Sequence, residues 1–141
     1  MDWSSTFREY VNMDPRLLLN IATNNADEVQ YTLAMYIGNS RSKRVMTQIF
    51  AGFALVDGDI TEEEYDLFRR VTDTLFDEYY TFSEFHDIAM EAKRGDYIGV
   101  VSPYLREADL QNAIIKLGLA IAAIDGCISV PEQKFIWCFD R

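Results

Sequence analysis

Residues 53–68 read FALVDGDITEEEYDLF, and residues 121–136 read IAAIDGCISVPEQKFI. The two stretches align at a constant spacing of 68 residues, which pairs Asp57, Gly58, Ile60 and Glu64 with Asp125, Gly126, Ile128 and Glu132. In each stretch an apolar run leads into Asp-Gly, and a hydroxyl residue then precedes a glutamate by three positions. Glycine suits the left-handed conformation that ends a helix, and Ser/Thr-x-x-Glu is a capping box that starts one. The repeat therefore predicts two pseudo-equivalent helix–Asp-Gly–helix units.

Apolar residues elsewhere in the chain follow helical spacing, and patterns typical of strands are scarce. The Asn24-Asn25 pair is expected to separate the first two helices, and residues 97–101 form either a helical turn or an extended link. The expected helices begin near Pro15, Ala26, Ser40 or Ser42, Thr61, Thr81, Glu107 and Ser129. We therefore expect an all-α fold: one compact domain over residues 1–141 with about seven helices.

The charge balance restricts the partners that the protein can have. The sequence contains thirteen Lys and Arg residues and 23 Asp and Glu residues, which gives a net charge of −10. A field of this sign repels phosphate backbones and anionic lipids, so we expect no nucleic-acid partner. The apolar run at 117–124 is too short to cross a bilayer, and Met1-Asp2-Trp3 does not resemble a secretory signal. With Cys127 and Cys138 read as reduced thiols, these features predict a cytoplasmic protein without membrane insertion.

The repeated acids suggest a cation site, although not an EF-hand. Placing Glu64 at the last position of an EF-hand loop puts Phe53 and Leu55 at positions that must supply oxygen ligands. If the two units pack about a pseudo-twofold axis, the carboxylates of Asp57, Glu64, Asp125 and Glu132 converge. Two carboxylates about 4 Å apart repel by roughly 4 kcal/mol, so such a cluster takes up protons or recruits Ca²⁺ or Mg²⁺. The alternative is that the four acids serve only as helix caps and solvated turns.

The repeated pattern Asp-Gly-x-Ile-Ser/Thr-x-x-Glu resembles the tellurite-resistance TerB family. The resemblance rests mainly on residues 53–68 and 121–136, and Cys127 stands in the second copy where Asp59 stands in the first. It implies an all-helical fold of two similar halves and an acidic surface with divalent-cation sites. It also implies a role in stress response or in membrane-associated complexes, through protein contacts rather than catalysis.

Few residues in the sequence are suited to catalysis. His86 is the only histidine, and Cys127 has no base near it in sequence. No nucleophile elbow or phosphate-binding glycine loop is present. We therefore expect a non-enzymatic module that binds a protein partner, with the aromatic tract from Phe76 to Phe85 as its candidate surface. Two alternatives stay open: a metal-dependent hydrolase that uses the acidic cluster, and an acidic mimic of nucleic acid.

Overall fold

The computed structural model describes residues 3–56 and 58–140 and confirms the all-α prediction. Its described part contains eight α-helices, one 3₁₀ turn and no strand. In chain order the elements are α1 (Trp3–Val11), α2 (Pro15–Ile37), α3 (Asn39–Leu55), α4 (Glu62–Phe76), α5 (Phe82–Arg94), α6 (Tyr97–Val101), the 3₁₀ turn (Ser102–Tyr104), α7 (Ala108–Ile124) and α8 (Val130–Trp137). None of the described helices is both long and apolar enough to cross a membrane.

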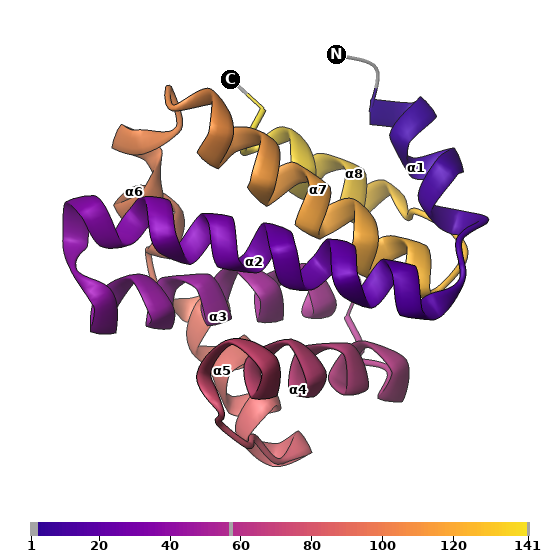
Figure 1. Cartoon of the computed structure of the whole chain (residues 1–141), viewed down its shortest axis with the longest axis horizontal. Helices are drawn as coiled ribbons and strands as arrows, with labels where there is room; N and C mark the ends of the chain where they lie inside the picture. The colour runs from indigo at the N-terminus through magenta and orange to yellow at the C-terminus, as the bar shows by residue number, and fades with distance from the viewer. Residues whose placement is uncertain (1–2, 57, 141) are drawn as a thin grey trace.

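The long helix α2 lies across the middle of the molecule and packs against α3 on one side and α7 on the other (Figure 1). Helix α7 also contacts α1 and α8, while α5 packs on α3. Aromatic rings fill the space beneath α3, where Phe68 stacks on Phe85 at 4.3 Å between ring centroids and Phe50 meets Phe68 edge-on. Burial of this apolar surface is the main source of stability in such a fold.

Helix α2 corrects one sequence prediction, because it runs without a break through Asn24 and Asn25. The side chain of Asn25 donates a hydrogen bond to the carbonyl of Ile21, one helical turn earlier, and Asn24 faces solvent. On the opposite face Ala22 and Ala26 are completely buried. The low helix propensity of two asparagines, well under 1 kcal/mol each, is smaller than the gain from packing the helix against two neighbours.

Other helix boundaries differ from the predicted ones in smaller ways. Helix α3 begins at Asn39, so Ser42 lies inside it and is buried. Helix α4 ends at Phe76 because Asp77 adopts a left-handed conformation with φ of 52°, which leaves Tyr79 in the following loop. The N-terminal helix α1 was not predicted from the sequence.

Candidate functional site

Each copy of the repeat leads into a complete capping box, as its Ser/Thr-x-x-Glu pattern predicts. At the start of α4, the Thr61 N–H donates to the Glu64 carboxylate at 2.8 Å, and the Glu64 N–H donates to the Thr61 hydroxyl at 3.1 Å. At the start of α8, Ser129 and Glu132 form the same pair of bonds at 2.9 and 3.2 Å. Both glutamates are buried, with exposed fractions of 1% and 4%. Each of these acids therefore has a structural task at a helix N-terminus.

The second turn also reaches the first unit. The Thr61 hydroxyl donates to the Asp125 carboxylate at 3.5 Å, which is a long contact between residues 64 positions apart in the sequence. This contact places the second Asp-Gly turn beside the capping box of the first helix pair. The predicted cation site requires all four carboxylates to converge, and this contact brings that of Asp125 to the first unit.

Three of the four predicted metal ligands lie in the described structure, while Asp57 lies outside the described residues. Glu64 and Glu132 each use a carboxylate oxygen to accept the cap hydrogen bond, from the N–H groups of Thr61 and Ser129. Among residues 3–56 and 58–140, no three His, Cys, Asp or Glu side chains are grouped closely enough to hold a metal ion. The four-carboxylate cation site stays a prediction, because its fourth ligand is not described.

The residues with catalytic potential are dispersed over the surface. His86 lies on the exposed side of α5, and Cys127 and Cys138 are exposed free thiols. Cys127 lies just before α8, and Cys138 lies just after it. A nucleophile needs a base within hydrogen-bond reach, and the hydrogen bonds of the described residues join no thiol to a histidine or carboxylate.

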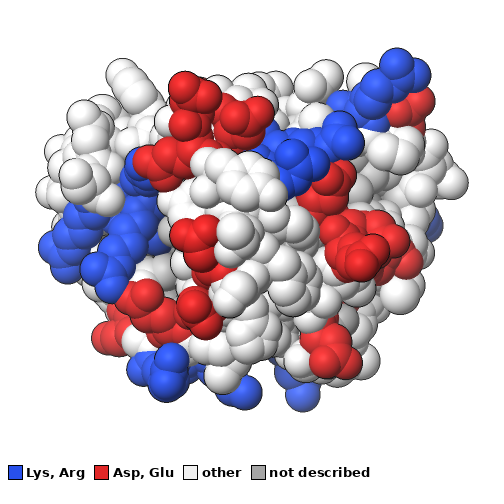
Figure 2. All heavy atoms as spheres, turned by 90° about the horizontal axis from the view of Figure 1, so that it is seen from below, with Lys and Arg blue, Asp and Glu red and all other residues white. Residues whose placement is uncertain are grey.

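The aromatic tract predicted as an interaction surface divides into buried and exposed rings. Phe85 is fully buried in the core, whereas 69% of Tyr79 and 43% of Phe82 are exposed. Phe82 packs edge-on against Tyr65 of α4 at 5.4 Å between ring centroids. We call the exposed rings of Tyr79 and Phe82, with the exposed acids of the same stretch of chain (Asp77, Glu84 and Asp87), the α4–α5 face. Figure 2 views the molecule from below, the side on which α4 and α5 lie in Figure 1, and shows both acidic and basic groups around an uncharged area.

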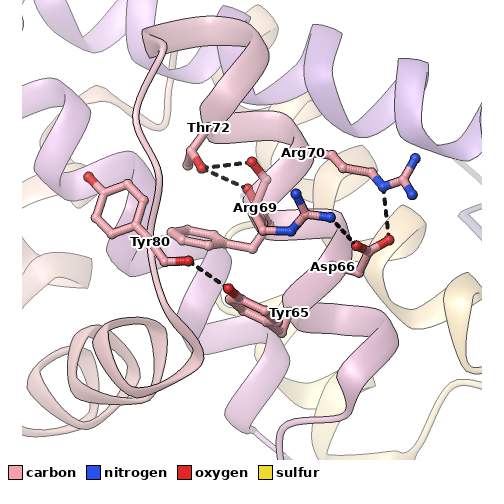
Figure 3. A network of polar contacts seen from close by, with 7 residues as sticks. Tyr65, Asp66, Arg69, Arg70, Thr72 and Tyr80 are labelled. Carbon is pink, nitrogen blue, oxygen red and sulfur yellow. Dashed lines mark hydrogen bonds and ion pairs between the residues drawn. The ribbon is translucent and has the colours of Figure 1, made fainter.

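The loop that carries Tyr79 is held in place on both sides. The Tyr65 hydroxyl donates to the carbonyl of Tyr80 at 2.7 Å (Figure 3). The Tyr80 hydroxyl donates to the Glu78 carboxylate at 2.7 Å. Glu78 also forms an ion pair with Lys43 of α3, whose ammonium lies 5.0 Å from the centre of the Phe76 ring. Partial burial, and then the nearby Tyr79, raise the pKa of Tyr65 above its ordinary value, so it stays a donor at neutral pH. Tyr79 is thus presented on an ordered loop.

One acid on α4 engages the two basic side chains closest in sequence to the α4–α5 face. Asp66 accepts from Arg69 at 2.7 Å and pairs with Arg70 at 2.9 Å (Figure 3). The hydrogen bond to Asp66 is the main cause that raises the pKa of Arg69. Such surface pairs contribute little to stability, but they reduce the positive charge that these arginines present to a partner.

Comparisons with models of protein families, with curated proteins and with solved structures found no match to this chain. The resemblance to the TerB family therefore stays a prediction based on the repeated motif.

Proposed function

We propose that this protein is a non-enzymatic binding module that recognises a basic segment of another protein through the α4–α5 face. The observation that carries the proposal is the pair of exposed aromatic rings, Tyr79 and Phe82, on an ordered and acidic part of the surface. Between Arg70 and Lys93 the chain contains six Asp or Glu residues and no Lys or Arg. Glu78 and Glu91 of this set pair with basic residues of α3, while Asp77, Glu84 and Asp87 are exposed.

The chemistry of this face defines the partner. Rigid aromatic side chains bury a large apolar area at a low cost in conformational entropy, so they are frequent anchors of interfaces. The surrounding acids repel other acidic surfaces and accelerate the approach of basic ones. A segment with Lys or Arg residues around an apolar side chain satisfies both requirements.

The proposal includes the finer assignments suggested by the sequence. The TerB-like motif supports a stress-related role, and the repeated acids support modulation by Ca²⁺ or Mg²⁺ at the Asp-Gly turns. Cys127 and Cys138 are exposed and form no disulfide, which suits the reducing conditions of the cytoplasm.

The test is affinity capture with variants of the face, followed by measurement of the Kd for the captured partner. Tyr79→Ala with Phe82→Ala is expected to weaken binding by at least about 30-fold, as loss of two interface anchors would. Asp77→Asn with Asp87→Asn is expected to weaken it a few-fold and to reduce its salt dependence, because these acids steer association. The matched control is Tyr31→Ala with Met35→Ala, which removes two exposed apolar side chains from α2.

Two results would contradict the proposal. Equal capture by the face variants and the α2 control would show that the α4–α5 face is not the binding surface. Metal-dependent turnover of a small-molecule substrate that is lost in Asp125→Asn would instead favour the hydrolase alternative.

A further inference from the structure

A small cavity opens between the C-terminal end of α3 and the helices α5, α6 and α8. It measures about 240 Å³, and its lining includes Gly52, Leu55, Ala89, Lys93, Tyr97 and Phe135. This volume is below the ~300–1,000 Å³ of cavities that hold drug-sized ligands, so only a small ligand fits. The described walls are mostly apolar, and Lys93 and Tyr97 are the described lining residues that carry a polar side chain.

The phenol belongs to Tyr97, of which only 6% is exposed. Every fully buried polar side-chain atom in the described residues has a hydrogen-bond partner. The Tyr97 hydroxyl forms no hydrogen bond within residues 3–56 and 58–140, so it is not fully buried, and its side chain lines this cavity. A nearly buried donor without a partner in the chain is what a ligand-binding cavity requires, because a bound acceptor supplies the missing bond.

The position of the Tyr97 ring depends on the absence of a side chain at residue 52. A Cβ atom on Gly52 would lie 2.4 Å from the Tyr97 hydroxyl oxygen and 3.2 Å from Cζ of Phe135. The glycine thus makes room for the end of the tyrosine ring against the backbone of α3. This close approach fixes the donor at the wall of the cavity.

Lys93 supplies the charge. It is exposed at the C-terminal end of α5, and no acid of the described residues lies within ion-pairing distance of its ammonium. An ammonium repels cations and binds carboxylates by charge-assisted hydrogen bonds. Leu55, Ala89 and Phe135 provide apolar contacts, which a compact and fully hydrated anion such as phosphate would not use.

We propose that this cavity binds a small monocarboxylic acid with an aromatic or branched apolar body. Its carboxylate accepts hydrogen bonds from the Tyr97 hydroxyl and the Lys93 ammonium, and its apolar body lies against Leu55 and Phe135. The site is formed by different side chains from those of the α4–α5 face, so it does not depend on the proposed protein interaction.

The test is titration of the full-length ¹⁵N-labelled protein, followed by NMR, with benzoate as the probe and benzamide as its neutral analogue. Benzoate is raised to about 10 mM, which saturates a site with a Kd of about 1 mM. We expect benzoate to shift the amide signals of Ala89, Lys93 and Phe135, and benzamide to bind at least about tenfold more weakly.

Two variants and two controls assign the binding groups. Lys93→Gln changes an exposed side chain, leaves the fold intact, and is expected to weaken benzoate binding by about tenfold. Tyr97→Phe keeps the ring and is expected to weaken it by about fivefold. Lys116→Gln and Tyr31→Phe remove the same groups away from the cavity and are expected to leave the Kd unchanged.

The proposal is overturned if benzoate produces no shifts around the cavity. It is also overturned if benzamide binds as tightly as benzoate, or if Lys93→Gln binds benzoate as tightly as the wild type. Inorganic phosphate is titrated in parallel, and tighter binding of phosphate than of benzoate would replace the carboxylate assignment with a general anion site.

Discussion

Glu64 and Glu132 are buried acids. Each accepts a hydrogen bond from the backbone N–H of the residue that caps the start of its own helix. These hydrogen bonds could be predicted from the sequence, since a capping box involves residues only three positions apart. The contact between Thr61 and Asp125 depends on how two helix pairs meet, and only the structure shows it.

The capping role of Glu64 predicts a difference between two substitutions. Glu64→Ala removes the acceptor of the Thr61 N–H in a buried position and is expected to lower the free energy of unfolding by about 1–3 kcal/mol. Glu64→Gln keeps an acceptor oxygen and loses mainly the favourable charge at the helix N-terminus, which costs about 0.3–1 kcal/mol. Urea unfolding followed by circular dichroism measures both, and Glu84→Ala, in the exposed capping box of α5, is the control.

The same glutamate tests the predicted cation site at Asp57, Glu64, Asp125 and Glu132. If the site binds Ca²⁺ or Mg²⁺, calorimetry of the wild type is expected to give a heat of binding. The heat is expected to be lost in Glu64→Gln, and also in the double variant Asp57→Asn with Asp125→Asn. If no binding is seen at millimolar metal, helix capping alone explains why the same acids recur in both copies.

Tyr97 predicts how stability changes at alkaline pH. Burial, and to a smaller extent the nearby Cys138, raise the pKa of Tyr97 above the ordinary value of 10.0. The folded protein therefore keeps this proton when the unfolded chain has released it. The retained proton contributes to the free energy of unfolding. This contribution is complete below pH 10 and is lost as the pH rises further, by up to about 1.4 kcal/mol per pH unit.

We expect the free energy of unfolding of the wild type, measured relative to that of Tyr97→Phe, to fall between about pH 9 and pH 11. The measurement is urea unfolding of both proteins over this range. The pKa values of Tyr10, Tyr65 and Tyr80 are also raised, but these residues are present in both proteins and cancel in the difference. A constant difference over the whole range would show that Tyr97 titrates alike in the folded and unfolded chains.

At the scale of the helix, α2 shows where local sequence reasoning fails. The Asn24-Asn25 pair has low helix propensity, and nothing nearby in the sequence shows that Ala22 and Ala26 become completely buried. Tertiary packing of one face decides the outcome. Helix α6 is a similar case, since its five residues are fixed mainly by the burial of Tyr97 and Val101.

A continuous α2 makes a prediction for Asn24, which is exposed in the middle of the helix. Asn24→Ala is expected to raise the free energy of unfolding by about 0.5 kcal/mol, because alanine has the higher helix propensity. Asn24→Pro is expected to lower it by about 3 kcal/mol or more. Thermal unfolding measures both changes. If α2 were broken at this point, proline would be tolerated and alanine would bring no gain.

At the scale of the whole molecule, the two predicted units are joined through close packing of α3 on α7. Gly118 of α7 lies directly against the ring of Phe53, so a Cβ atom there would be 2.5 Å from Cε1 of that ring. Phe53 is 1% exposed and packs against Phe135 and Phe139, with ring centroids 4.8 and 5.8 Å away. The sequence shows only an apolar run around Gly118, because the partner ring comes from residues 65 positions away.

This packing predicts that Gly118→Ala destabilises the protein although alanine is the better helix former. The gain in helix propensity is about 1 kcal/mol, whereas overpacking a ring that has no space to move costs about 1–3 kcal/mol. Phe53→Leu creates room, so the cost of Gly118→Ala is expected to fall in that background, with a coupling energy of at least about 0.5 kcal/mol in a double-mutant cycle. Urea unfolding of the four proteins gives the cycle. Additive effects would mean that the α3–α7 contact relaxes around the added methyl group, and that the ring of Phe53 does not hold the two units at a fixed distance.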